Sequence, residues 1–164
     1  MKIDIQEMIG FSARDKKKYL EACDLISRAV KTDKFKNLVL NYYYVVNGKR
    51  VNGFFNCDMN NREVYEHIMS GKDKYGDADG DLDIKVKMYY SWKNVIGYTY
   101  PSTIWTYINR RYFRRWAPKY IARNIFHEAM HNCGFTHSKK RHSLRKHSAP
   151  YALGSIIGKV IEGL

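Results

Sequence analysis

The sequence predicts an α+β fold in which helices pack on a twisted mixed β-sheet of four to five strands. Three observations indicate this class. The segment 82–92 alternates apolar and polar residues, which is typical of a strand with one buried face. Apolar residues recur at three- and four-residue steps over 13–30 and 118–133, as in amphipathic helices. The length of 164 residues suits one compact domain covering 1–164.

The first half of the chain is expected to supply two helices and a hairpin. Ser12 precedes the helix over 13–30, and the acid three residues after it completes a capping-box pattern. Two strands are expected over 38–46 and 51–55, joined by an Asn-Gly turn. A short helix over 60–70 follows, with a glycine behind it as a C-terminal cap.

The second half is expected to complete the sheet and to supply the main buried helix. The strand over 82–92 is followed by two more, over 95–100 and 104–108. Pro118 suits the first turn of a helix with a broad apolar surface that runs up to a glycine at 134. Apolar positions over 153–164 indicate a closing helix.

Charge and composition limit the partners and the compartment. The chain has 29 Lys and Arg against 16 Asp and Glu, a net charge of +13 that favours acidic partners, including nucleic acid. No stretch approaches the roughly 20 apolar residues of a membrane helix. The mixed charges at the start do not resemble a signal peptide, and three widely spaced cysteines fit reduced thiols. We therefore expect a cytoplasmic monomer with no membrane span, unless a leader has already been removed.

A metal-binding pattern lies inside the helix expected to start at Pro118. His127 and His131 are four residues apart, which places both imidazoles on one side of the helix. Gly134 can adopt the left-handed conformation and turn the chain back, so that His137 returns as a third ligand. Three imidazoles leave the fourth tetrahedral position of a Zn²⁺ ion open, as in catalytic zinc sites.

Glu128 is the expected general base of this site. It leaves the helix beside the first ligand and can reach a water at the ion without binding the ion itself. Zinc lowers the pKa of such a water to roughly 7, so a neighbouring carboxylate can take its proton during attack on a carbonyl. In a chain of this composition, H-E-x-x-H with the later Gly and His arises by chance in about 2 of 100,000 sequences. The pattern therefore favours a zinc site over coincidence.

The segment 127–137 resembles the long zinc signature of the metzincin metallopeptidases, H-E-x-x-H-x-x-G-x-x-H, at all five fixed positions. Looser similarity at 82–86, 96–101 and 108–109 resembles three strands of the matrixin-like branch. The resemblance implies a zincin-like single metallopeptidase catalytic domain with zinc at the cleft floor and a small C-terminal subdomain after the active-site helix. It also implies that a peptide lies antiparallel to the edge strand and is bound by Gly97, Tyr98 and Thr99.

One part of the family pattern is different here. Metzincins carry a methionine turn, S-x-M-x-Y, beneath the zinc, but no Met follows Met130 in this chain. The nearest segment is Ser148-Ala149-Pro150-Tyr151. The resemblance implies that Pro150 replaces the methionine as an apolar floor. It leaves two interpretations of Tyr151, as an oxyanion-stabilising residue or as an ordinary packed side chain.

Two further features have alternative interpretations. Alternating carboxylates over 77–83 suggest either a loose Ca²⁺ site or a solvated acidic turn; an EF-hand is excluded because Leu82 and Met88 stand where Gly and Glu are needed. Basic clusters over 110–123 and 139–146 either bind anionic partners or form solvated faces. If they flank the cleft, they favour acidic substrates. His142 and His147 are interpreted as surface residues.

The leading hypothesis is a zinc-dependent endopeptidase acting on a protein or peptide substrate. One alternative is a zinc-dependent RNA-processing endonuclease, since a bacterial rRNA-maturation family shares the histidine spacing but carries Gly after its first histidine. The other is a non-catalytic basic binding module with a retained zinc site. Glu128 disfavours both, because the nuclease family lacks it and a structural site needs no base.

Overall fold

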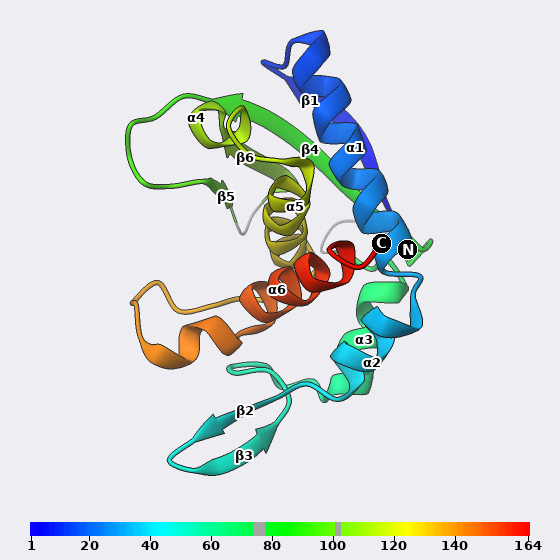
Figure 1. Cartoon of the computed structure of the whole chain (residues 1–164), viewed down its shortest axis with the longest axis vertical. Helices are drawn as coiled ribbons and strands as arrows, with labels where there is room; N and C mark the ends of the chain where they lie inside the picture. Colours follow the sequence, from blue (N-terminus) through cyan, green and yellow to red (C-terminus); the bar gives the residue numbers. More distant parts are fainter. Residues whose placement is uncertain (74–77, 101–102) are drawn as a thin grey trace.

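The computed structural model describes residues 1–73, 78–100 and 103–164. Its main sheet has four strands in the order β1-β4-β6-β5 (Figure 1). Strands β1 (Lys2–Ile9), β4 (Asp81–Tyr89) and β6 (Trp105–Asn109) are parallel to one another, and β5 (Gly97–Thr99) is an edge strand that pairs antiparallel with β6. The prediction of a mixed sheet with helices packed on it is confirmed.

One face of this sheet is covered by helices. Every second residue of β4 is buried, and these side chains form the centre of the core: Leu82, Ile84, Val86 and Met88. The long helices α1 (Ala13–Ala29) and α5 (Pro118–Asn132) lie across the same face (Figure 1). The alternation that predicted a half-buried strand therefore has its physical cause in this layer of helices.

Helix α1 begins with the predicted capping box. The Ser12 hydroxyl accepts a hydrogen bond from the backbone N–H of Asp15, and the Asp15 carboxylate accepts one from the backbone N–H of Ser12. The same carboxylate is buried and lies 3.0 Å from Nη2 of Arg114. Arg114 follows the short helix α4 (Arg110–Phe113), so one side chain joins the start of α1 to the region between the sheet and α5.

Helix α6 (Ala149–Ile161) crosses α5 at very short range. It is preceded by a 3-10 helix, η1 (Ser143–His147), and packs on α5 along its buried face. Gly154 permits the crossing, because a Cβ there would lie 3.2 Å from the Arg123 carbonyl oxygen and 3.4 Å from the His127 Cβ. This contact brings the first turn of α6 next to the metal-binding pattern on α5.

The predicted strand over 38–46 is wrong in its first part. Helix α2 (Asp33–Leu40) occupies this region, capped by the Thr32 side chain and anchored by two buried residues one turn apart, Phe35 and Val39. Strand β2 (Tyr43–Val46) begins only after that helix.

The hairpin itself is confirmed, but it is a separate sheet. Strands β2 and β3 (Lys49–Asn52) pair antiparallel and extend away from the four-stranded sheet (Figure 1). Asn47 and Gly48 have φ values of 50° and 75°, as a two-residue turn of this kind requires. The expected strand over 51–55 stops at Asn52, although Phe55 forms an isolated bridge with Ser148.

Strand β1 was not expected from the sequence. It pairs in parallel with β4, and the register shifts between Ile5 and Glu7. This bulge interrupts the two-residue period, so apolar residues before and after it do not form one alternating run. The helix over 60–70 is confirmed as α3 (Asn61–Met69), capped by Asn60 and followed by Gly71 with a φ of +70°. Among the described residues, no helix is long and apolar enough to cross a membrane.

Candidate metal centre and cleft

Three histidines meet at the C-terminal end of α5. The candidate ligand atoms of His127, His131 and His137 lie within 4.8 Å of one another. The first two occupy one side of α5, one turn apart, as the spacing predicts. Gly134 has a φ of +92°, and the backbone N–H of Phe135 binds the Met130 carbonyl, so the chain turns back at the expected position. The convergence of the three imidazoles is confirmed.

Backbone carbonyls orient the three rings. Nδ1 of His131 lies 2.8 Å from the Phe135 carbonyl oxygen, and Nδ1 of His137 lies 3.2 Å from that of Ser138. His127 is hydrogen-bonded to the backbone of Pro150. An imidazole that donates through Nδ1 presents the lone pair of Nε2, and metal-binding histidines are held in this way.

The protonation of these rings suits a cation. Burial, together with the neighbouring imidazoles of His131 and His137, lowers the pKa of His127 to about 3. Burial also lowers the pKa of His137. Both rings are therefore neutral at physiological pH, which is the form that binds a metal ion. Three imidazole nitrogen donors, oriented by backbone carbonyls, fit Zn²⁺ as a donor set.

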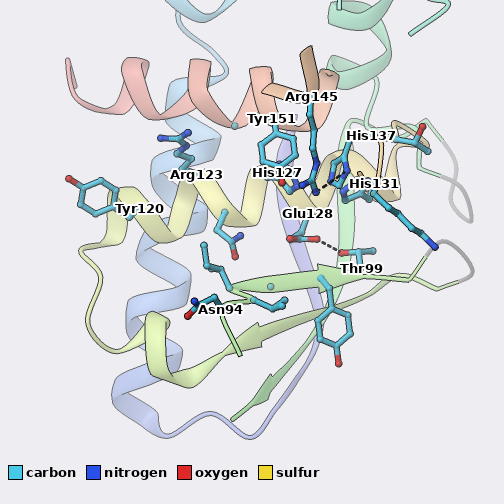
Figure 2. Close-up of a pocket in the computed structure, with 18 of the residues that line it drawn as sticks. Asn94, Thr99, Tyr120, Arg123, His127, Glu128, His131, His137, Arg145 and Tyr151 are labelled. Carbon is cyan, nitrogen blue, oxygen red and sulfur yellow. Dashed lines mark hydrogen bonds between the residues drawn. The ribbon is translucent and has the colours of Figure 1, made fainter. Parts of the chain in front are cut away.

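Glu128 is buried beside the histidine cluster. Only 4% of its surface is exposed, and Oε2 accepts a hydrogen bond from the Thr99 hydroxyl at 3.1 Å (Figure 2). Burial raises the pKa of Glu128 to about 7, although the hydrogen bond from Thr99 acts in the opposite direction. A carboxyl group with a pKa near neutrality can take up and release a proton at physiological pH.

The segment 148–151 lies against the histidines. Pro150 is buried in the first turn of α6, and the ring of Tyr151 packs on His127 and His137 with centroid distances of 4.5 and 4.8 Å. The backbone of Pro150 is hydrogen-bonded to His127, whereas a role for its ring as an apolar floor in place of the methionine stays a prediction. A role for the Tyr151 hydroxyl in stabilising an oxyanion stays a prediction.

The site opens into a cleft of about 1100 Å³, bounded by β5, α5, α6 and the basic loop after His137 (Figure 2). Strand β5 forms one wall, and its register on β6 decides where its backbone groups point. The N–H of Asn109 binds the Ile96 carbonyl, so the hydrogen-bonded pairs alternate and include Tyr98 with Tyr107. Gly97 and Thr99 fall on the other positions, so their N–H and C=O groups are directed to the open edge of the sheet.

Gly97 also fits tightly between β5 and α5. A Cβ at this position would lie 2.9 Å from the Tyr107 carbonyl oxygen and 3.0 Å from Oδ1 of Asn124. It would lie 3.4 Å from Oε1 of Glu128. Only glycine lets the edge strand approach the helix closely enough for Thr99 to bind the glutamate.

The two basic clusters contribute unequally to the cleft. Among the described residues, Arg123 is the one cation of the first cluster that lines it, whereas Lys139, Arg141 and Arg145 come from the second. Three other cations of the first cluster bind groups within the fold. Arg114 pairs with Asp15, Lys119 pairs with Glu162, and Arg111 donates to the Trp92 carbonyl.

The other histidines and the acidic turn lie apart from this centre. His67 binds the Cys133 carbonyl, His147 binds the Tyr42 hydroxyl, and His142 packs on Phe55. Asp79 accepts from the backbone of Asp81, Asp81 pairs with Lys2, and Asp83 binds Gln6. Asp77 is outside the described residues. Within the described ranges, the three ligand histidines are the only group of at least three His, Cys, Asp or Glu placed to hold an ion.

Two contributions to the site were not predicted from the sequence. Thr99 was expected to act through its backbone, but its hydroxyl also binds Glu128. Arg145 was one cation of a basic run, and only the structure shows it lying over Tyr151, at 4.9 Å from the ring centroid. Neither contact has a spacing signal, because each joins elements that are distant in the sequence.

No known protein-family model matches this chain, and no curated protein and no solved structure does so either. The chain is therefore characterised by its mixed sheet, its surrounding helices and a possible three-histidine metal site.

Proposed function

We propose that this protein is a zinc-dependent endopeptidase similar to the metzincins. The observation that carries the proposal is the position of a buried glutamate beside three converging histidines, in a cleft with an open strand edge as one wall. His127, His131 and His137 would hold the ion. When bound, Zn²⁺ polarises a carbonyl group and makes water acidic enough to act as a nucleophile near neutral pH.

The proposed role of Glu128 is proton transfer. Its Oε2 is held by Thr99, so the carboxylate has a fixed orientation in the cleft. In this orientation it would accept a proton from the attacking water and deliver it to the leaving amine. General base catalysis of this kind contributes about 10²–10⁴-fold to rates.

Strand β5 would align the substrate. The outward-directed backbone groups of Gly97 and Thr99 offer hydrogen bonds to an extended peptide that adds to the edge of the sheet. This pairing would run the scissile bond past Glu128, because Thr99 itself contacts that side chain.

The proposal is tested by Glu128→Ala in zinc-loaded protein. The expected result is an unchanged zinc content and a loss of casein cleavage of at least about 100-fold, since only the base is removed. His131→Ala should lose both zinc and cleavage. Unchanged cleavage by Glu128→Ala would overturn the mechanism.

Parallel incubation with structured RNA separates the proposal from the nuclease alternative. We expect casein to be cleaved and RNA to remain intact. Zinc-dependent RNA cleavage without peptide hydrolysis would replace the proposal, and zinc-dependent stability with neither activity would favour a binding module.

A further inference from the structure

The cleft beside the histidines has an unbalanced charge. Its lining includes four cationic residues but only one carboxylate, that of the buried Glu128. The cations are Arg123, Lys139, Arg141 and Arg145. None of them makes an ion pair within the described part of the chain. A substrate bound here therefore meets a positive surface, to which a divalent ion would add further charge.

Arg145 differs from the other three because its position is fixed. It is half-buried in η1, and its guanidinium carbon lies 4.9 Å from the centroid of the Tyr151 ring. Nη2 lies 3.5 Å from Nδ1 of His137 (Figure 2). The side chain is thus held between Tyr151 and the histidine cluster, on the wall of the cleft opposite β5.

The guanidinium of Arg145 lacks a suitable acceptor. Its Nε is buried and has no hydrogen-bond partner among the described residues. Nδ1 of His137 also lies 3.2 Å from the Ser138 carbonyl, which can only accept, so Nδ1 cannot donate to that carbonyl and accept from Arg145 at once. A ring that donates to this carbonyl presents an N–H group, not a lone pair, to Nη2. A guanidinium stays charged in a protein, so its unpaired donors can bind an acceptor that enters the cleft, and a carboxylate is the strongest such partner among peptide side chains.

We propose that Arg145 is a specificity-determining residue that binds a carboxylate side chain of the substrate, so that the cleft selects acidic peptides. The inference rests on the proposed endopeptidase function, which makes an extended peptide the ligand. A carboxylate is the planar partner that a guanidinium binds through two parallel hydrogen bonds. Arg145 contacts His137 from its Nδ1 side. We therefore expect the acidic residue to lie beside the cleaved bond, with its carboxylate on Arg145 and away from the reacting carbonyl.

A structural role for Arg145 would give a different result. If the side chain only supported His137 and Tyr151, its loss would weaken the binding of every peptide equally. A recognition role instead affects only peptides that carry the carboxylate. The test therefore compares two peptides that differ by one group, a Glu peptide cleaved beside its Glu and the same peptide with Gln at that position.

Binding is measured by calorimetry with zinc-loaded Glu128→Gln protein, so that neither peptide is consumed. We expect the Glu peptide to bind at least about tenfold more tightly than its Gln twin, as a hydrogen-bonded charge pair would give. Adding Arg145→Gln should remove that difference in affinity and should change the affinity for the Gln peptide by less than about twofold. The matched control is Arg62→Gln, an exposed arginine on α3 outside the cleft, which should change neither. The proposal is overturned if Arg145→Gln weakens the binding of both peptides equally, or if the Glu128→Gln protein without it shows no preference for the Glu peptide.

Two further variants keep the test decisive if Arg145→Gln does not fold. Arg145→Lys retains the charge but not the paired donors, and should keep only part of the preference. Arg145→Glu should reverse it in favour of a peptide with Lys at the same position. Circular dichroism and zinc content show whether each variant is folded. The proposal is overturned if both variants fold and neither distinguishes peptides by the charge at that position.

The outcomes also separate this inference from the proposed function. Arg145-dependent binding of the Glu peptide, with no cleavage by zinc-loaded wild type, contradicts the peptidase but supports the acidic-peptide site. Cleavage without any preference for the Glu peptide supports the peptidase but contradicts the acidic-peptide site. Arg145-dependent binding of single-stranded RNA, with no discrimination between the Glu and Gln peptides, overturns the assignment of a peptide as the ligand of Arg145.

Discussion

At the scale of single residues, the hydrogen bond from Thr99 to Glu128 links the edge strand to the proposed base. The two oxygens are 3.1 Å apart, and the Thr99 hydroxyl also lies 3.3 Å from that of Thr106. Thr99→Val keeps the shape of the side chain but removes the donor. We expect kcat for peptide cleavage to fall by about 10- to 100-fold with zinc content unchanged, because a hydrogen bond to a charged group contributes about 1.5–3 kcal/mol.

The matched control for this prediction is Thr103→Val. Its hydroxyl binds the backbone N–H of Trp105 at 3.2 Å, away from Glu128. This variant should change kcat by less than about twofold. Equal losses in both variants would show that Thr99 acts only through the stability of the β5–β6 region.

Tyr19 offers a test of the core at the same scale. Its side chain is fully buried in α1, and its hydroxyl has no hydrogen-bond partner in the described part of the chain. An unsatisfied buried polar group costs about 1–3 kcal/mol. We therefore expect Tyr19→Phe to leave the free energy of unfolding unchanged or to raise it by up to about 1 kcal/mol, measured by urea titration. A loss of more than about 1 kcal/mol would mean that the hydroxyl is satisfied in solution.

The residues predictable from the sequence are those with a local spacing rule. His127, Glu128 and His131 follow from one helical turn, and His137 from a glycine that reverses the chain. Arg145 has no such rule, because five cations lie close together and only packing on Tyr151 selects one of them. Tertiary contacts of this kind cannot be read from sequence spacing.

At the scale of elements, the crossing of α5 and α6 sets the position of the first histidine. Gly154→Ala would place a Cβ 3.2 Å from the Arg123 carbonyl oxygen and 3.4 Å from the His127 Cβ. Because backbone is involved, the helices must separate slightly. We expect a loss of about 1 kcal/mol or more in stability and of about 10-fold in zinc affinity, measured by competition with a chelator.

Gly158→Ala, one turn later on α6, is the control. Its nearest contact would be the Arg123 Cδ at 3.6 Å, an ordinary van der Waals distance. Since alanine favours helix over glycine, stability should rise by up to about 1 kcal/mol and zinc affinity should not change. If the two variants behave alike, close packing at Gly154 does not position His127.

The elements that were predicted correctly have strong local signals. Strand β4 shows an uninterrupted two-residue period, and α1 and α3 start at capping boxes. Strand β1 lacks such a period because a bulge shifts it, and α2 is only eight residues long. In α2 the four-residue spacing of Phe35 and Val39 competes with the alternation just after it, and packing of that face decides in favour of the helix.

At the scale of the whole molecule, the Asp15 carboxylate joins two parts of the chain and makes stability depend on pH. Burial raises the pKa of Asp15, but hydrogen bonds from Arg114 and Ser12 outweigh it, and the pKa lies below its ordinary value of 3.8. A lowered pKa stabilises the folded state above about pH 4, and this contribution is lost as the pH falls through the folded-state pKa. Acid should therefore weaken the link between α1 and Arg114.

Asp15→Asn tests this dependence. At pH 7 we expect the free energy of unfolding to fall by about 1–3 kcal/mol, with the difference from wild type shrinking as the pH drops below about 4. Asp24→Asn, which removes an exposed pair with Arg28, should cost less than about 0.5 kcal/mol. A difference at Asp15 that stays constant down to pH 2 would contradict the assigned ion pair.

The most direct test of the proposed zinc centre is X-ray absorption at the zinc edge of the loaded, full-length protein. Three imidazole nitrogens at about 2.0–2.1 Å and one further light ligand are expected for one zinc per chain. His137→Ala should lose one imidazole from this set. A sulfur ligand, a spectrum unchanged by His137→Ala, or failure to bind stoichiometric zinc would contradict the three-histidine centre.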